Sequence, residues 1–195
     1  DKFEALCRII DVSSEFYGLI FCRTKVGLDE LTNKLIDRGY DADGIHGDLS
    51  QFQRERILEK LKKRRLSILC ATDVAARGID IDNLTHVINY SLPQDPEAYV
   101  HRIGRTGRAG KKGIAITFIS PSEYKKLQFI SKSAKTDIRK ESLPHGKDIV
   151  TVKLKRLHEE LSDIIDANTH EEFKKTADKL LEKHDPVDLI AGLLK

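Results

Sequence analysis

Short apolar runs rich in β-branched residues alternate with helix-like stretches along the first part of the chain. The runs lie at 18–22, 68–72, 87–90 and 114–119, and a weaker one ends at Ile45. Between them lie two apolar stripes of helical spacing, Leu28, Leu31, Leu35 and Ile36 in the first and Ile57, Leu58 and Leu61 in the second. This alternation predicts an α/β fold, a parallel sheet with helices on both faces. Ligands of such sheets bind beyond the carboxyl ends of the strands.

Polar and glycine residues follow three of these runs, at the expected carboxyl edge of the sheet. Thr24 follows the run at 18–22, Gly47 follows the weaker run that ends at Ile45, and Thr72 ends the run at 68–72. Ser50 and Gln53 have the spacing of a capping box, which predicts that a helix begins there. A helix N-terminus, a glycine N–H and small hydroxyls together form a phosphate cradle that reads no base sequence. The alternative is that these residues form turns that only end the strands.

The octapeptide HRIGRTGR, which begins at His101, concentrates cationic side chains beside two glycines. If the octapeptide is helical, His101, Arg105 and Arg108 share one face. Arginine binds phosphate oxygens through a planar fork, and Gly104 and Gly107 let the backbone approach a ligand. The octapeptide therefore predicts a site for a polyanion such as a nucleotide triphosphate. The alternative is a solvated basic helix end.

Charge is distributed unevenly along the chain. The net charge is +3, but residues 148–195 hold eight Lys and Arg against eleven Asp and Glu, which leaves 26 against 20 in residues 1–147. A basic body suits a phosphate backbone, whereas an acidic tail is a poor partner for RNA. We therefore divide the chain into an α/β domain at 1–147 and a helical extension at 148–195.

Composition excludes several other classes of protein. No apolar run approaches the roughly eighteen residues that span a bilayer, and no signal peptide opens the chain, so we expect no membrane partner. The cysteines Cys7, Cys22 and Cys70 are isolated in apolar contexts. They predict buried thiols in a reducing compartment, the cytoplasm, with no disulfide framework and no metal site.

Four blocks, in this order and at this spacing, resemble the second RecA-like domain of superfamily 2 RNA helicases of the DEAD-box family. They are LIFCRTK at 19–25, HGDLSQFQR at 46–54, ATDVAARGID at 71–80 and HRIGRTGR at 101–108. The resemblance extends from residue 1 to about 145, because DKFEAL at the start is similar to the helix that enters this domain. The related DEAH and RecQ-type helicases usually begin the last block with glutamine, whereas this chain has His101.

The resemblance implies a role for each matching residue. Contacts to the RNA sugar-phosphate backbone are implied for Thr24, Gly47, Arg54 and Thr72. Contacts to ATP are implied for Asp80 at the ribose and for Arg105 and Arg108 at the γ-phosphate, with Arg108 as an arginine finger, and Gly78 is grouped with them. Coupling between the RNA and nucleotide sides is implied for Gln51, His101 and Arg102. No row of aromatics accompanies these positions, so base stacking is not predicted.

Half of the implied ATP site is missing from the sequence. The chain contains no G-x-x-x-x-G-K-[ST] loop, no Asp-Glu-Ala-Asp block for magnesium and no methionine. We therefore expect a piece of a longer protein whose first RecA-like domain holds most of the ATP and magnesium, and no ATP hydrolysis by this chain alone. Two alternatives remain. A superfamily 2 DNA helicase domain is disfavoured by HRIGRTGR and HGD, and a non-catalytic RNA-binding or scaffold domain is disfavoured by Asp80, Arg105 and Arg108.

The residues after Pro144 have an all-helical pattern. Apolar positions recur at helical spacing in two segments, Leu154, Leu157, Leu161 and Ile164 and then Phe173, Ala177, Leu180 and Leu181. Thr169 with Glu172 predicts a capping box for a second helix, and Asp185-Pro186 predicts the start of a third. Three helices of about fifteen residues or fewer are marginal alone, so the tail either docks on the α/β body or forms a homodimer. It loosely resembles the extension that follows the helicase core in bacterial cold-shock helicases of the DeaD and CshA kind, which favours a dimerisation module.

Overall fold

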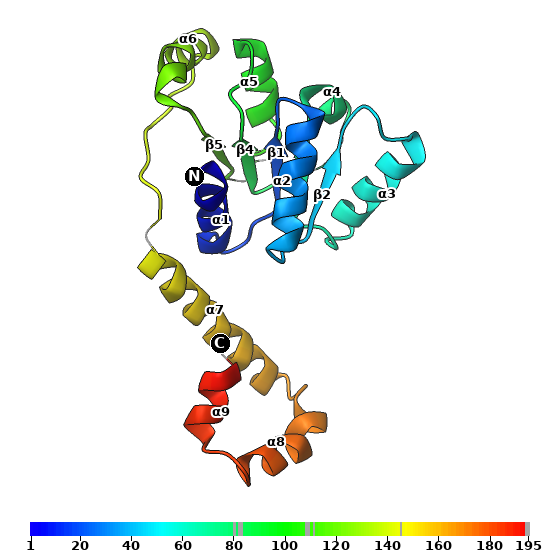
Figure 1. Cartoon of the computed structure of the whole chain (residues 1–195), viewed down its shortest axis with the longest axis vertical. Helices are drawn as coiled ribbons and strands as arrows, with labels where there is room; N and C mark the ends of the chain where they lie inside the picture. The colour runs from blue at the N-terminus through cyan, green and yellow to red at the C-terminus, as the bar shows by residue number, and fades with distance from the viewer. Residues whose placement is uncertain (80, 82–83, 108–109, 111, 145, 194–195) are drawn as a thin grey trace. The chain divides into compact units, whose positions relative to one another are not determined.

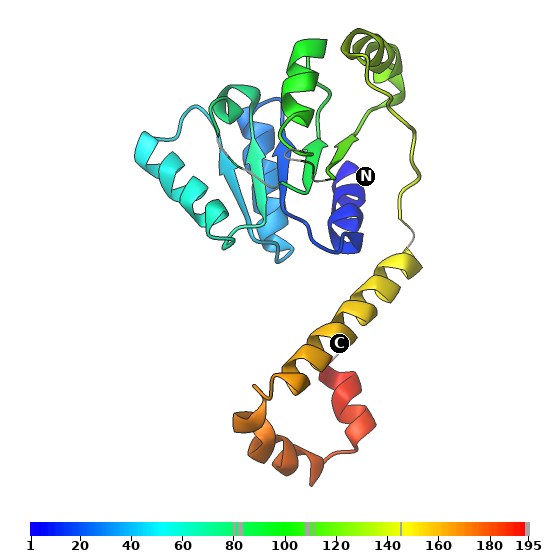
Figure 2. The same cartoon turned by 180° about the vertical axis from the view of Figure 1, so that it is seen from behind.

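A computed structural model describes residues 1–79, 81, 84–107, 110, 112–144 and 146–193. The chain divides into two compact units, Asp1–Pro144 and His145–Lys195. The first unit is an α/β domain, and the second consists of helices (Figures 1 and 2). Within the described residues, no helix is both long enough and apolar enough to cross a membrane.

Five parallel strands form the sheet of the first unit, and each predicted apolar run contributes one of them. In chain order they are β1 Gly18–Phe21, β2 Ala42–Ile45, β3 Ile68–Ala71, β4 His86–Asn89 and β5 Ile114–Thr117. Their order in space is β2-β3-β1-β4-β5. All residues of the central strands β1 and β3 are buried, as expected where helices cover both faces of a parallel sheet. The predicted fold class is confirmed.

Helices α1 Lys2–Val12 and α2 Lys25–Asp37 cover one face of the sheet (Figure 1). The α1 helix confirms the entry helix that the first residues predicted. In α2, three of the four predicted apolar positions are buried: Leu28, Leu31 and Leu35. The fourth, Ile36, is exposed, so its assignment to the buried stripe is wrong. It lies about 100° around the helix from Leu35 and therefore points away from the sheet.

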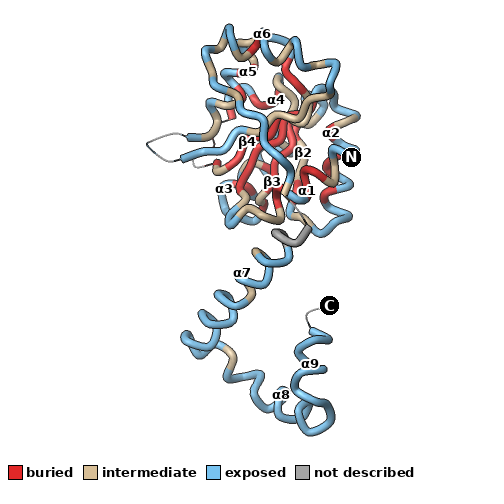
Figure 3. The backbone as a smooth tube through the Cα atoms, turned by 90° about the vertical axis from the view of Figure 1, so that its left-hand side faces the viewer, coloured by how far each residue is buried: buried red, intermediate tan, exposed pale blue. Residues whose placement is uncertain are grey.

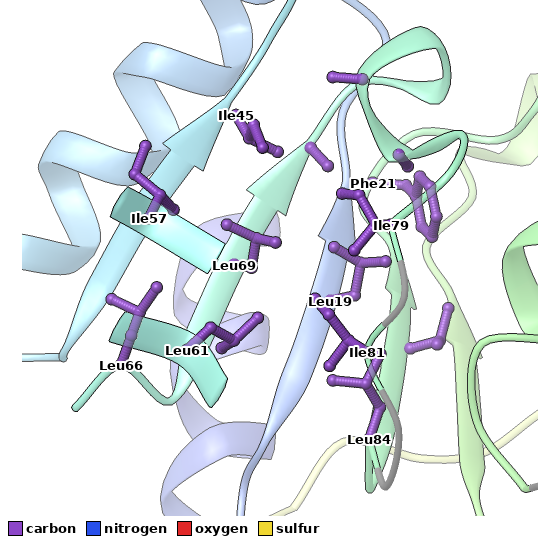
Figure 4. Close-up of a cluster of buried hydrophobic side chains, with 14 of the residues drawn as sticks. Leu19, Phe21, Ile45, Ile57, Leu61, Leu66, Leu69, Ile79, Ile81 and Leu84 are labelled. Atoms are coloured by element: carbon purple, nitrogen blue, oxygen red, sulfur yellow. The ribbon is translucent and has the colours of Figure 1, made fainter. Parts of the chain in front are cut away.

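Helices α3 Gln51–Lys62 and α4 Asp73–Ala76 cover the other face. The apolar cluster between them and the sheet is drawn in Figure 4 and includes Leu19, Ile45, Ile57, Leu61, Leu69 and Ile79. The predicted capping box of α3 is confirmed. The Gln53 N–H donates to Ser50 Oγ at 3.3 Å, and the Ser50 N–H donates to Gln53 Oε1 at 2.9 Å.

The β4–β5 end of the sheet carries helices α5 Pro96–Ile103 and α6 Tyr124–Ala134, the latter preceded by the short 3₁₀ helix η1 Pro121–Glu123. They pack on each other through a separate small cluster around Leu92, Tyr99 and Ile130. Elsewhere in the unit the three cysteines are buried, as predicted. Burial raises the pKa of the Cys22 thiol to about 12, so this side chain behaves as a small apolar residue.

The second unit contains helices α7 Gly146–Asp166, α8 Lys174–Leu181 and α9 Pro186–Leu193, with a 3₁₀ turn η2 at Glu171–Phe173. The α7 helix has 21 residues, so the prediction of three helices of about fifteen residues or fewer is wrong for the first of them. No described residue between 150 and 193 is buried, which Figure 3 shows as an almost continuous exposed tube. The described part of this unit, 150–193, therefore forms no hydrophobic core of its own.

One of the two predicted caps in this unit forms. Asp185 Oδ1 accepts hydrogen bonds from the N–H groups that open α9, at 2.8 Å from Val187. The predicted capping box of Thr169 with Glu172 is wrong, because Thr169 instead closes the preceding helix. The N–H and the hydroxyl of Thr169 both donate to the Ile164 carbonyl. The residue before it, Asn168, has a left-handed conformation with φ of 54°, which is typical of the end of a helix.

Candidate nucleic-acid interface and nucleotide site

The carboxyl ends of three neighbouring strands are level. Phe21, the last residue of β1, pairs with Ala71 of β3, which in turn pairs with Ile45 of β2. The residues that follow therefore lie along one edge of the sheet in the order of the strands. We call this edge the rim and define it as the segments 22–25, 46–50 and 72–78. The rim brings together three of the four residues for which the resemblance implies RNA contacts, Thr24, Gly47 and Thr72, and the fourth, Arg54, lies in the first turn of α3.

Two threonines of the rim stand at helix starts. Thr24 is the N-cap of α2 and accepts a hydrogen bond from the Gly27 N–H at 3.1 Å. Thr72 is the N-cap of α4, but its hydroxyl makes no cap bond to that helix. Thr24 is exposed and Thr72 is partly exposed. The two threonines thus follow two adjacent strands at positions that solvent reaches.

The two rim glycines differ in why glycine stands there. A side chain added at Gly47 would meet no atom within 4 Å, so the backbone there is open to a bulky anion. Gly78 has φ of 71°, a left-handed conformation that favours glycine in the turn after α4. Glycine at 78 is therefore favoured by the backbone conformation. Glycine at 47 instead leaves the backbone N–H accessible to an anion.

Arg54 ties α3 to the turn after α4. Its Nη2 group donates to the Ala75 carbonyl at 2.6 Å and to the Arg77 carbonyl at 3.1 Å. Both bonds use the same terminal nitrogen, so the other side of the guanidinium fork faces away from these carbonyls. Arg54 therefore fixes the position of the 75–78 turn and presents charge at the rim.

An ion pair and a histidine–carboxylate contact link the β2–α3 loop to α2 across the rim. Lys25 Nζ lies 2.5 Å from Asp48 Oδ2, and His46 Nε2 lies 3.4 Å from Asp29 Oδ1. The ammonium of Lys25 lowers the pKa of the Asp48 carboxyl through a direct hydrogen bond. Because Lys25 and Asp48 are both well exposed, this pair contributes little to stability, and a phosphate can replace the carboxylate at Lys25.

The arginine block is not one continuous helix, so the condition under which His101 and Arg105 would share a helix face is not met. The α5 helix ends at Ile103, and Gly104 is its C-cap. Gly107 then adopts φ of 68°, in the left-handed region. Two glycines three residues apart disfavour helix continuation. Arg108 lies outside the described residues, as does Asp80.

Arg102 is the most deeply placed cation of the block, with a side chain only 3% exposed. Its Nε and Nη2 donate to the two carboxylate oxygens of Asp73 at 2.6 and 2.8 Å. Its Nη1 donates to Asn89 Oδ1 at 2.9 Å and to the Ser91 carbonyl at 2.8 Å. The guanidinium also lies over the Phe21 ring, 4.8 Å from its centre. This network joins α5 to the residue that directly follows Thr72.

Asp73 and Asn89 were not identified from the sequence. A signal for each was present: Asp73 directly follows a rim threonine, and Asn89 is a polar residue inside an otherwise apolar run. Asn89 is completely buried and also donates to Thr117 Oγ1 at 3.1 Å. A buried amide of this kind needs partners for its donors and its acceptor, and Arg102 supplies one of them.

Arg105 lies beside the segment that leads to residue 80. Its Nη1 donates to the Ile79 carbonyl at 2.9 Å, and its side chain is partly buried.

The resemblance implies a coupling role for Gln51, His101 and Arg102. Gln51 and His101 lack a network of contacts like that of Arg102. Gln51 bonds to Glu55 one turn along α3 at 2.7 Å, and the structure records no hydrogen bond or ion pair of the exposed His101 side chain within the described residues. Only Arg102 of the three has the contacts of an organising residue.

Comparison with known proteins agrees with this geometry. Residues 1–110 match the model of the helicase conserved C-terminal domain. The ATP-dependent RNA helicase CshA of Listeria monocytogenes is 45% identical over the whole chain, which covers 38% of that protein. The chain spans about two fifths of the length of the curated relatives that it matches.

Solved structures give the same result. A DEAD box protein of Methanococcus jannaschii is 55% identical, with a TM-score of 0.68 over 72% of this chain and 39% of that one. The E. coli DEAD-box protein SrmB is 32% identical, with a TM-score of 0.65 over 74% of this chain and 91% of that one. The chain belongs to the family of helicase conserved C-terminal domains, in its DEAD-box branch.

Proposed function

We propose that this chain is the second RecA-like domain of an ATP-dependent RNA helicase and that its rim binds the RNA backbone. The observation that carries the proposal is the level edge at which β2, β3 and β1 end beside Gly47, Thr72 and Thr24. Hydroxyls, a glycine N–H and cations at one edge suit phosphate and ribose rather than bases. Binding of this kind is independent of RNA sequence.

The nucleotide half of the proposal depends on Arg105. Its guanidinium donates to the carbonyl of Ile79, the residue that precedes Asp80 in the sequence. Arginine at this position stabilises negative charge on the transferred phosphoryl group. ATP and magnesium are held mainly by a first RecA-like domain that this chain does not contain. RNA and ATP bound across both domains draw them together and bend one strand of a short duplex.

A DNA helicase domain and a non-catalytic scaffold are the weaker candidates. The relatives described above are named RNA helicases or DEAD-box proteins, which favours RNA. The network of Arg102 with Asp73 joins α5, the helix that begins the arginine block, to the rim, and such a link supports coupling between the two sides rather than a scaffold. The three buried, unpaired thiols support a cytoplasmic location.

Thr72→Ala is expected to weaken binding of single-stranded RNA by about two- to tenfold, the effect of one lost neutral hydrogen bond. Because the Thr72 hydroxyl makes no cap bond, unfolding of the chain should be unchanged. Fluorescence anisotropy at low salt measures the affinity, with Ser14→Ala, an exposed residue before the amino end of β1, as the control. The wild-type chain should also prefer RNA to DNA of the same sequence. Equal affinity for both, or no effect of Thr72→Ala, would contradict RNA binding at the rim.

We further propose that the second unit makes the protein a homodimer. Apolar side chains of all three helices are exposed, among them Leu193 at 79% and Val187 at 72%, and no described residue of 150–193 is buried. A groove between α8 and α9 is lined by Leu180, Leu189 and Leu193. An acidic unit is an improbable RNA partner, whereas a second copy offers the same apolar surface. Two helicase domains on one body would raise avidity for a long RNA.

Light scattering at concentrations of tens of micromolar is expected to give a dimer for residues 1–195 and a monomer for residues 1–147. Leu180→Glu with Leu193→Glu should convert the long chain to a monomer, because each carboxylate would have to be buried in the groove. Lys179→Glu with Lys183→Glu changes two exposed neighbours and serves as the control. Monomers for both lengths would favour docking of the tail on its own α/β domain, and a dimer of residues 1–147 would place the interface elsewhere.

A further inference from the structure

The segment that contains α6 and the residues that follow it is strongly basic. Residues 124–140 contain six Lys and Arg and one Asp. This short stretch therefore carries a net charge of +5. None of these cations belongs to the rim.

The exposed face of α6 carries both cations and an aromatic ring. Lys125, Phe129 and Lys132 are spaced by four and three residues and share one side of the helix. The opposite side packs against α5 through Leu127 and Ile130. The Phe129 side chain is 63% exposed, and the flanking lysines are exposed. The ring therefore stands in solvent between two ammonium groups.

Two further residues extend this surface. Tyr124 at the start of α6 is 55% exposed, and Lys135, the C-cap, is exposed. We call the five residues Tyr124, Lys125, Phe129, Lys132 and Lys135 the α6 patch. The hydration of an exposed aromatic ring is unfavourable, and this ring does not contribute to the stability of the fold, since the core of this region is formed by other side chains. A ligand that covers the ring recovers this cost.

The α6 patch begins where the rim ends. Arg23, which precedes the rim residue Thr24, lies 3.7 Å from Glu123, which precedes Tyr124. Its Nη2 group also reaches the Leu92 carbonyl at 3.5 Å. In addition, β5 and β1 run in the same direction, so α6 and its 3₁₀ turn begin at the same carboxyl edge as the rim (Figures 1 and 2). A strand that leaves the rim past Thr24 can reach the patch without crossing the sheet.

We propose that the α6 patch is a second RNA-binding surface, which holds the flank of the strand that the rim binds and stacks a base on Phe129. The proposal extends the proposed function of the rim and depends on it. Cations interleaved with exposed aromatic rings suit single-stranded nucleic acid, because phosphates bind the ammonium groups while bases stack on the rings. The rim has hydroxyls and a glycine instead, so the two surfaces bind different parts of the strand.

A charge-reversal experiment tests the electrostatic part. Lys125→Glu with Lys132→Glu is expected to lower the affinity for a long single-stranded RNA about tenfold or more at low salt, and to leave a short RNA that fills only the rim nearly unaffected. The slope of log affinity against log salt should fall by about 0.7 for each lost phosphate contact. Lys174→Glu with Lys175→Glu in the second unit makes the same change in net charge and is the control. Equal losses for both pairs would overturn the patch.

A fluorescence experiment tests the stacking part. The chain contains no tryptophan, so Phe129→Trp introduces a single reporter. Phe173→Trp is a matched control, because Phe129 and Phe173 are both 63% exposed. RNA is expected to quench the tryptophan at 129 and not the one at 173, and RNA of the same length without bases should bind without quenching.

The outcomes separate this inference from the proposed function. If anisotropy shows RNA binding while the tryptophan at 129 stays unquenched and the Lys125 and Lys132 reversals match their control, the patch is refuted and the rim stands. If the wild-type chain binds no RNA, the proposed function fails and the patch fails with it. If inorganic tripolyphosphate binds and the reversals abolish only that binding, the patch is a site for a small polyanion and not for RNA.

Discussion

Arg105→Ala is expected to lower ATP turnover by about 10³-fold or more when it is made in the longer protein that includes the first RecA-like domain, with ATP and RNA saturating. Arg108→Ala should have a similar effect. The reason is that charge builds up on the transferred phosphoryl group, and a preoriented guanidinium stabilises it in a site without water. RNA affinity without nucleotide should change little, because Arg105 lies beside Ile79 and not on the rim.

The contact of Arg105 with the Ile79 carbonyl allows a second interpretation, a purely structural role, and the experiment must distinguish it from transition-state stabilisation. If the side chain only holds the 79–81 segment in place, Arg105→Ala lowers stability, and Arg105→Lys restores most of the turnover. If it stabilises the transition state, Arg105→Ala leaves the unfolding midpoint nearly unchanged and lysine restores little, because an ammonium lacks the planar fork. Arg139→Ala, at a side chain 80% exposed, is the control. Near-normal turnover of Arg105→Ala would show that the γ-phosphate assignment is wrong.

Strands buried on both faces were predictable from sequence because two-sided burial leaves a plain apolar signal. The strands β1 and β3 are apolar and fully buried, whereas β2 contains Asp43 and Gly44 and gave only a weaker signal, and β5 was found although it is partly or largely exposed. The start of α3 was equally clear, since the side chains of Ser50 and Gln53 satisfy backbone groups within four residues of each other. A capping box and an apolar run can each be recognised within a short stretch of sequence, without knowledge of distant parts of the chain.

Predictions failed where two local rules competed. His101 and Arg105 fit a helical spacing, but the helix ends at Ile103 with Gly104 as its C-cap, so the pattern of charge does not extend it. Thr169 fits an N-cap, yet its hydroxyl closes the helix before it. A hydroxyl can bond to the backbone on either side, so residue spacing alone does not decide between the two.

The partners of Arg102 could not be predicted, because they come from separate parts of the sequence. Asp73 precedes it by 29 residues and Asn89 by 13, and only the packing of α4, α5 and β4 brings them together. A pattern of spacing contains no information on such contacts. The resemblance implied that Arg102 couples two sides of the site, and the structure adds the acceptors through which it can do so.

Asp73→Ala is expected to destabilise the chain by about 3–5 kcal/mol, more than Arg102→Met, which should cost about 1–3 kcal/mol. The asymmetry follows from what each change leaves behind. Without Asp73, a guanidinium that is only 3% exposed loses its charged partner and keeps the acceptors of Asn89 and Ser91. Without Arg102, the Asp73 carboxylate is 38% exposed and can be solvated by water.

Urea unfolding of both single variants and of the double variant measures the two costs and their coupling. The double variant should be more stable than Asp73→Ala alone, because no buried charge remains unpaired. Asp137→Ala breaks the exposed pair with Arg139, whose side chains are 75% and 80% exposed, and should change stability by less than about 1 kcal/mol. A larger loss for Arg102→Met than for Asp73→Ala would mean that packing over Phe21 and the bonds to Asn89 and Ser91, rather than the ion pair, hold α5 to α4.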